Sequence, residues 1–376
     1  MKYITLILRI LTGALFIFSG IIKANDPLGF GYKLEEYFVE FGMDWDWLLS
    51  IKTFLASAIC VFEVVLGVAL ILGYKMVAVT WLSLIMMIFF TILTGASAIF
   101  DIVRTCGCFG DAIPLTPWQS FYKDLILDAV ILLLFIKRKE IKPLLPEKIS
   151  AGIVLLSLVA TVYFTVYVTR HLPVWDFRPY KVGNNIPELM KLPPNAKQPV
   201  YENILYYKNK NTGEVEEFTE QNYPWDDEEN YEFVDRETKL IEEGDEPKIH
   251  DFNILTEDGF DITEDILNDP EPIFVVIMYD LNLTNVEGLK KVNTFAQECY
   301  NNGYNIIALT ATGFEKINEL KEKYNLVFDF YNTDEVTLKT IVRSNPGVIL
   351  LKQGTIEGKW SFRDLPEPGK ILNNEK

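Results

Sequence analysis

The sequence predicts an α-helical membrane bundle followed by a soluble α/β domain. Hydrophobic residues make up 49% of the 376 residues, and they are concentrated before about Arg170. Acidic residues are concentrated after it and dominate a formal net charge of −17. From residue 250 onward, apolar runs alternate with amphipathic stretches, as strands alternate with helices in α/β domains. One ordinary globular domain does not combine these compositions, so we expect a membrane half and an acidic soluble half.

Five segments define the predicted membrane half. A helix that spans a bilayer needs about 20 predominantly apolar residues. Four stretches meet this requirement: Ile4–Ile22, Ser50–Gly73, Met76–Phe100 and Ile149–Thr169. One further stretch, Trp118–Ile136, begins with polar residues and becomes apolar only afterwards. We expect a four-helix transmembrane bundle, with Ile149–Thr169 as an additional, fifth span that tethers the soluble half.

Basic residues fix the predicted orientation. Residues 137–148 carry five lysine or arginine side chains, whereas the loop after the first span is acidic and aromatic. The positive-inside rule then places the N-terminus in the cytoplasm. Five spans would deliver everything after Arg170 to the extracytoplasmic side. The same topology places Cys106 and Cys108 there, in an oxidising compartment.

Composition divides the chain into four predicted regions. These are the bundle at 1–140, a basic loop with the fifth span at 141–170, an acidic linker at 171–248 and the α/β domain at 249–376. Within the linker, residues 201–219 alternate around an Asn-Thr-Gly turn and predict a β-hairpin. The charge run at 223–233 is interpreted as a solvated loop, since it lacks the ligand spacing of an EF-hand. The acidic balance disfavours nucleic acid and anionic lipid headgroups as partners of this half.

The α/β domain has a predicted order of elements. We expect strands at 272–279, 305–311 and 326–331, helices at 313–324 and 335–343, and a closing hairpin at 347–362. A further helix should follow the first strand, begin at a capping box of Thr284 and Glu287, and end near Gly303.

Three features of this region carry a resemblance. They are the stretch "HDFNILTEDGFDITEDI" before the first strand, the strand and helix order, and Pro346 within "SNPGVILL". On these features the region from His250 onward resembles a thioredoxin-like domain of the thiol peroxidase and TlpA kind, with Pro346 at the place of that fold's cis-proline. The family's Cys-x-x-Cys would fall in Tyr279–Asn285, which contains no cysteine. The domain is therefore expected to be redox-silent, and Cys299 to be a buried structural cysteine.

The membrane half carries a second resemblance. Its residues are Arg9 with Gly13, "FSGIIK" followed by Asp26-Pro27, Glu63 with Gly67 and Gly73, and the motifs "CGCFGD" and "KDLILD". On these motifs, residues 1–140 resemble the DoxX/MauE family of small bacterial membrane proteins. The resemblance implies a bacterial inner membrane, with the soluble half in the periplasm, and disulfide-related chemistry at that membrane. In the MauE branch it implies maturation of a periplasmic, disulfide-rich dehydrogenase subunit.

Cys106 and Cys108 are separated only by Gly107. A disulfide between residues two apart closes a small, strained ring, and glycine makes the required dihedral angles accessible. Strained disulfides have higher reduction potentials and tend to oxidise other thiols. Arg104 would favour the thiolate form of Cys106. These traits predict a redox-active pair, with Cys106, Cys108 and Arg104 as the catalytic candidates.

Two other interpretations of the cysteine pair stay open. A metal site would need more ligands, and the candidates on the same side are His171, His250 and carboxylates such as Asp111. Alternatively, the two cysteines are turn residues or a static clip. We expect no resident metal.

Ionisable residues inside the predicted spans form a second candidate site, because charges there are costly and mark ion pairs or pathways. Glu63 and Asp128 lie well inside their spans, and Arg9 and Lys52 lie nearer the ends. The two carboxylates are candidates for binding a cofactor. That cofactor would be a membrane quinone, which would accept the electrons from the cysteine pair. The alternative is an internal ion-pair lattice in which Glu63 bonds Arg9. Cys60, one turn before Glu63, is expected to be a packed, neutral thiol.

These features predict a thiol-disulfide redox or maturation factor that acts on an extracytoplasmic protein client. Its C-terminal domain would bind the client or shield the cysteine pair. The alternative is a non-catalytic assembly subunit of a cell-envelope complex, favoured by the missing thiols and the large acidic extension. A small-solute transporter is less favoured, since no inverted repeat is visible. The expected partners are the lipid bilayer and a protein client or complex subunits, without nucleic acid.

Overall fold

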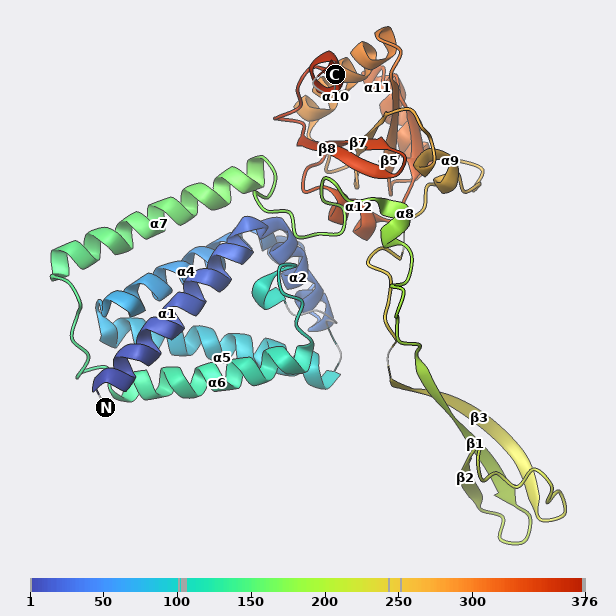
Figure 1. Ribbon diagram of the computed structural model, residues 1–376, viewed down its shortest axis with the longest axis horizontal. Coiled ribbons are helices and arrows are strands. Elements are labelled where there is room, and N and C mark those ends of the chain that lie inside the picture. The colour runs from blue at the N-terminus through green and yellow to red at the C-terminus, as the bar shows by residue number, and fades with distance from the viewer. Residues whose placement is uncertain (1, 101, 103–106, 243, 251, 374–376) are drawn as a thin grey trace. The chain divides into compact units, whose positions relative to one another are not determined.

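The computed structural model describes residues 2–100, 102, 107–242, 244–250 and 252–373 (Figure 1). Contacts divide the chain into two compact units. The first unit comprises Met1–Gly183 and Asn253–Lys376, and the second comprises Asn184–Phe252. The first unit therefore contains both the long helices and the C-terminal sheet.

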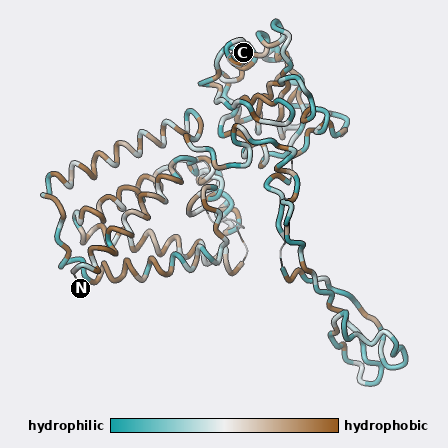
Figure 2. The backbone as a smooth tube through the Cα atoms, viewed as in Figure 1, coloured by the Kyte–Doolittle hydropathy of each residue, from teal (hydrophilic) through white to brown (hydrophobic). Residues whose placement is uncertain are grey.

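Within the described residues, four helices are long and apolar enough to cross a membrane. They are Tyr3–Asn25 in α1 (Lys2–Asn25), α4 (Lys52–Leu72), α5 (Met76–Phe100) and α7 (Glu147–Arg170). Hydrophobic residues follow these helices along their length (Figure 2). The four stretches predicted to be long and apolar enough to span a bilayer are thus confirmed as membrane-competent helices.

The remaining expected span, Trp118–Ile136, falls in α6 (Pro117–Ile136). Thr116 and Gln119 form a capping box at its start, with Pro117 at the first helical position. It is not among the helices apolar enough to cross a membrane, because it carries three charged residues: Lys123, Asp124 and Asp128. Its crossing of a membrane therefore stays a prediction.

Helices α5 and α6 lie side by side in opposite directions. Near one end of the pair, the rings of Trp81 and Phe135 meet edge to face with centroids 4.6 Å apart. Farther along, Thr94 Oγ1 donates to Asp124 Oδ2 at 3.0 Å. These two contacts, about 13 residues apart on α5 and 11 on α6, show that the helices remain together over most of their length.

Small residues bring α1 and α4 into close contact. A Cβ atom on Gly67 would lie 2.6 Å from the carbonyl oxygen of Gly13, and one on Gly13 would lie 2.6 Å from that of Gly67. Real Cβ atoms do not approach backbone so closely, so only glycine fits at both positions. Helix α7 packs against α4 and α1.

One end of the bundle is rich in basic residues, and we call it the basic end. There Arg9 donates from Nη1 to the carbonyl oxygen of Lys142 at 3.1 Å, and Lys75 pairs with Glu147 at 3.0 Å. The linker between α6 and α7 adds three lysines and one arginine. The opposite end carries Asn25, α2 (Pro27–Glu40) and α3 (Asp46–Ser50).

Helix α2 begins at Pro27, two residues after the end of α1. The side chain of Asp26 accepts a hydrogen bond from the Gly29 amide at 2.9 Å and caps the helix, while Pro27 occupies the first turn. The Asp26-Pro27 pair thus acts as a helix start.

The C-terminal part of the first unit is a five-stranded mixed sheet in the order β6-β5-β4-β7-β8. The strands are β4 (Ile273–Ile277), β5 (Asn305–Thr310), β6 (Asp329–Asn332), β7 (Gly347–Lys352) and β8 (Thr355–Ser361). The helices are α9 (Thr263–Leu267), α10 (Val286–Asn301), α11 (Phe314–Tyr324), α12 (Glu335–Ile341) and α13 (Pro368–Asn373). β4, β5 and β6 are parallel, β7 and β8 close the sheet as a hairpin, and β4 is fully buried. The predicted order of elements is confirmed.

The predicted start of α10 is wrong by one residue. Asn285 caps the helix by accepting from the Gly288 amide at 2.9 Å, whereas Thr284 Oγ1 donates to the carbonyl oxygen of Asp280. The bond to Asp280 holds Thr284 in the preceding turn. The peptide bond before Pro346 is cis.

The second unit contains α8 (Ile186–Leu189) and a three-stranded antiparallel sheet in the order β2-β1-β3. The predicted hairpin is confirmed as β1 (Val200–Asn209) and β2 (Val215–Thr219). β3 (Tyr231–Glu242) was not predicted from the sequence. It is exposed along nearly all its length, so its side chains lack the apolar alternation that marks a half-buried strand.

Candidate functional site

The turn between α5 and α6 carries the predicted cysteine pair. Arg104 and Cys106 lie outside the described residues, as does the side chain of Cys108. The backbone from Gly107 to Phe109 is a short 3₁₀ helix, η1. Phe109 is buried and anchors this turn, with its ring 5.8 Å from that of Phe18 and the Lys123 ammonium 5.1 Å from its centroid. Phe109 thereby packs η1 against α1 and α6.

Beside this turn lies a small cavity of about 70 Å³, which we call the turn pocket. Its walls come from the end of α1, the start of α2, η1 and its next turn, the connector after α7, and the segment after α12. The lining residues are Ile22, Lys23, Asn25, Asp26, Gly29, Phe30, Lys33, Gly107, Gly110, Asp111, Pro173, Trp175, Phe177, Arg178 and Arg343. Four of them are basic and two are acidic.

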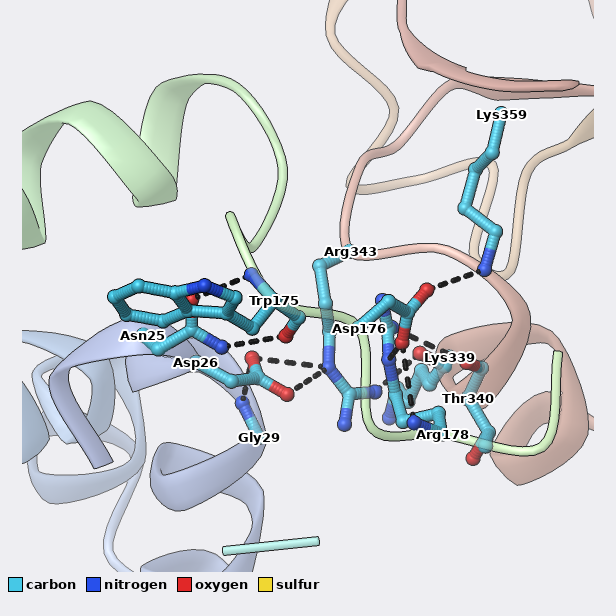
Figure 3. A network of polar contacts seen from close by, with 10 residues as sticks. All are labelled: Asn25, Asp26, Gly29, Trp175, Asp176, Arg178, Lys339, Thr340, Arg343 and Lys359. Carbon is cyan, nitrogen blue, oxygen red and sulfur yellow. Dashed lines mark hydrogen bonds and ion pairs between the residues drawn. The ribbon is translucent and has the colours of Figure 1, made fainter. Parts of the chain in front are cut away.

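Asp26 and Arg343 join the bundle to the C-terminal sheet at this pocket (Figure 3). Arg343 donates from Nε to both carboxylate oxygens of Asp26, at 2.8 and 3.1 Å. Burial alone would raise the pKa of Asp26, but the charges of Arg343 and Arg178 and the Gly29 amide outweigh it and hold the pKa below its ordinary value. Burial opposes the charge on Arg343, yet Asp26 raises its pKa. The pair is therefore ionised at neutral pH.

The connector after α7 is held on both sides (Figure 3). Toward the bundle, Asn25 donates to the Trp175 carbonyl at 2.7 Å and accepts from its amide at 3.0 Å. Toward the sheet, Asp176 bonds Lys359 of β8 at 2.8 Å, and it also bonds Arg178 of the connector at 2.8 Å. These five residues with the Asp26–Arg343 pair form one polar network over the turn pocket.

We expect Lys359 to make stability depend on pH. Burial and the nearby charge of Arg178 lower the pKa of Lys359 to about 8 from an ordinary 10.5, while Asp176 opposes that change and Arg343 adds to it. Between these two pH values the unfolded chain binds more protons than the folded chain. The free energy of unfolding therefore rises with pH across this window, by at most about 1.4 kcal/mol per pH unit.

The measurement is unfolding of the detergent-solubilised chain at pH 7.5 and 9.5, for wild type and Lys359→Met. We expect the variant to gain less stability than wild type between the two pH values. An equal gain in both proteins would show that Lys359 is not the group responsible.

The ionisable residues inside the bundle pair differently from the prediction. Glu63, on α4, bonds the ammonium of Lys23, on α1, at 2.5 Å, and both side chains are almost fully buried. The predicted bond between Glu63 and Arg9 is wrong, because Arg9 lies beside Gly73 at the basic end. The Lys23 ammonium also lies 4.6 Å from the centroid of the Phe90 ring. An internal ion pair is thus confirmed, with a different cation.

Lys23 lines the turn pocket as well as bonding Glu63. The pair therefore connects the bundle interior with the wall of that pocket. Lys52, the other cation considered, pairs with Glu35 on α2.

Asp128 has another environment. Thr91 Oγ1, on α5, donates to its Oδ2 at 2.6 Å. Glu63 and Asp128 thus engage different partners on different helices, and the prediction that both bind a cofactor stays a prediction.

Cys60 and Cys299 are free, fully buried cysteines. Their predicted burial is confirmed. Burial, with a smaller contribution from Glu298, raises the pKa of Cys299 to about 12, so this thiol stays protonated at neutral pH. Neither residue is placed to react with a soluble client.

Among the described residues, no group of three or more His, Cys, Asp and Glu side chains is arranged to hold a metal ion. His171, one of the ligands considered, bonds Asp364 at 2.6 Å and stacks on Tyr167. Asp111 lines the turn pocket.

Sequence reasoning missed Asp26, Lys23, Arg178, Arg343 and Lys359 as site residues. Asp26 had a signal, because Asp followed by Pro is typical of a helix start. Arg343 directly precedes the "SNP" segment, but nothing in the sequence indicates a contact with a residue 317 positions away.

Two parts of the chain match known families. Residues 1–137 match the family described as methylamine utilisation protein MauE. The N-terminal helical part is similar to MauE proteins. Residues 201–243 match DUF8463, a domain of unknown function. No curated protein and no solved structure matches the chain.

Proposed function

We propose that the chain is a membrane accessory protein that exchanges a disulfide with an extracytoplasmic client through Cys106 and Cys108. The similarity of residues 1–137 to MauE proteins supports an accessory role in a maturation system. The observation that carries the proposal is that Gly107 and Gly110, on either side of Cys108, line a pocket with four basic side chains. Nearby positive charge favours the thiolate, which is the attacking form in thiol exchange.

The proposed topology has five spans in a bacterial inner membrane. Contacts between α5 and α6 near both ends of the pair support a crossing by α6 as well. The basic end then faces the cytoplasm by the positive-inside rule. The turn pocket, at the opposite end of α1, faces the periplasm together with the C-terminal sheet.

The proposed role of the C-terminal domain is that of a redox-silent, thioredoxin-like adaptor. The strand order β6-β5-β4-β7-β8, with Pro346 directly before β7, supports the thioredoxin-like assignment. The segment Tyr279–Asn285, between β4 and α10, has no thiol. Through the bond from Arg343 to Asp26, this domain covers one wall of the turn pocket.

The proposed exchange needs no reactant other than the cysteine pair and two thiols of the client. A client thiolate attacks one sulfur of oxidised Cys106–Cys108, so a mixed disulfide forms and the other cysteine leaves as a thiolate. The second client thiolate then attacks the client sulfur of the mixed disulfide. The client gains a disulfide, the pair is reduced by two electrons, and the reverse sequence reduces a client disulfide. Neither Glu63 nor Asp128 is assigned to a quinone in this proposal.

The test is trapping of mixed disulfides in cells. We expect Cys108→Ser to accumulate an adduct through Cys106, and the Cys106→Ser, Cys108→Ser double variant to give none. The matched control is Cys60→Ala with Cys299→Ala, which removes only buried thiols and should behave as wild type. Wild-type thiols that show no reversible change in labelling under oxidant and reductant would end the exchange proposal.

A second candidate function is that of a non-catalytic assembly subunit. The polar network favours it, because Asp26, Asp176, Arg178, Arg343 and Lys359 hold the soluble domain on the bundle without any thiol. The cysteine double variant separates the two functions. If it still assembles with its partners and supports growth, the scaffold is the function.

A further inference from the structure

We propose that the β2-β1-β3 sheet docks an extended, basic segment of another protein along the outer edge of β3. This inference goes beyond thiol exchange and does not depend on it. It rests on three properties of the sheet: an unpaired edge, its charge and its uncovered apolar side chains.

The outer edge of β3 is long and unpaired. β3 has 12 residues and pairs with β1 along one side, and no described strand pairs with its other side. The strand presents about 40 Å of backbone donors and acceptors along this edge. Proteins normally keep exposed edges short, as at the opposite edge of this sheet, where β2 has five residues. The length of β3 instead suits the addition of another strand.

The charge of the sheet selects the partner. Residues 200–242 contain 13 acidic and four basic side chains, a formal net charge of −9. On β3 itself, Glu232, Asp235 and Glu242 are exposed. Such charges repel a second copy of the same strand, and they attract a segment rich in lysine and arginine.

The sheet also leaves apolar side chains uncovered. Tyr207, at its centre, has its ring centroid 5.8 Å from that of Phe218 and 5.5 Å from that of Phe233. This small cluster leaves Phe233 about half exposed, at 53%, and Tyr201 and Leu240 are exposed farther along the sheet. Aromatic faces beside acidic groups suit the aliphatic stems and cationic heads of lysine and arginine.

The boundaries of the sheet indicate a separate module. The match to DUF8463 covers residues 201–243, and the three strands occupy residues 200–242. The sheet also belongs to a compact unit, Asn184–Phe252, that is separate from the long helices and the C-terminal sheet. A module with its own boundaries and little core is suited to binding rather than to support of the fold.

The experiment uses the full chain in detergent and a fluorescent 12-residue peptide in which lysine alternates with valine. We expect binding that weakens with added salt, no binding of the matching glutamate peptide, and at least tenfold weaker binding when every peptide nitrogen is methylated. Methylation removes the backbone donors that strand addition needs, while the charges stay. Equal binding of the methylated peptide would overturn strand addition.

Charge reversal locates the site. The test variant is Glu232→Lys, Asp235→Lys and Glu242→Lys. The control variant, Glu257→Lys, Glu271→Lys and Glu322→Lys, makes the same change in net charge on exposed residues outside the sheet. We expect at least tenfold weaker peptide binding for the first variant and less than twofold for the second. Equal losses, or no binding by wild type, would overturn the proposal. The proposal would also be overturned if wild type sedimented as a dimer and the first variant as a monomer.

Discussion

Replacing Glu63 by alanine should destabilise the bundle by about 3–5 kcal/mol, because it removes the carboxylate that bonds the buried Lys23 ammonium. The ion pair lies between α1 and α4, and the Lys23 side chain is only 3% exposed. Neutralising the lysine relieves only part of the cost, because deprotonation of a buried amine also requires free energy. The measurement is the free energy of unfolding in mixed detergent micelles.

The control for this prediction removes both charges. In Lys23→Met with Glu63→Leu, two apolar side chains of similar volume replace the pair, and we expect stability within about 1.5 kcal/mol of wild type. A Glu63→Ala variant as stable as wild type would show that the pair is not buried in the folded protein. Lys23 also lines the turn pocket. The rate of thiol exchange in the stable double variant then tests whether the ion pair contributes to that exchange.

The partner of Glu63 illustrates what one sequence can predict. Hydropathy identified α1 and α4, and the cost of charge in a bilayer predicted an internal ion pair. Choosing between Arg9 and Lys23 required the register of two antiparallel helices. The contact of Gly13 with Gly67 sets that register and places Arg9 beside Gly73 and Lys23 near Glu63. Close-packing glycines were visible in the sequence, but their pairing was not.

The same distinction applies to the soluble parts. Local patterns predicted β4, β5 and α11, because each has a clear apolar run or helical period. The bond between Asp26 and Arg343 joins residues that no local pattern connects. β3 was missed for another reason. Its side chains face solvent, so they do not alternate between apolar and polar as those of a half-buried strand do.

A methyl group at the crossing of α1 and α4 should also be strongly destabilising. The Cβ of Gly67→Ala would lie 2.6 Å from the Gly13 carbonyl oxygen and 2.9 Å from the Ile17 amide nitrogen. Both are backbone atoms, so the helices must move apart, and the pairing of Lys23 with Glu63 must adjust with them. We expect a loss of about 1–3 kcal/mol, which is typical of overpacking a close contact.

Gly152→Ala, on α7, is the matched control for this prediction. No neighbouring atom lies within 4 Å of its Cβ position, and alanine favours a helix over glycine by about 0.5–1 kcal/mol, so this variant should be as stable as wild type or slightly more so. Both variants are compared by unfolding in mixed micelles. If Gly67→Ala also gains stability, α1 and α4 do not approach closely. The register that brings Lys23 to Glu63 would then need another cause.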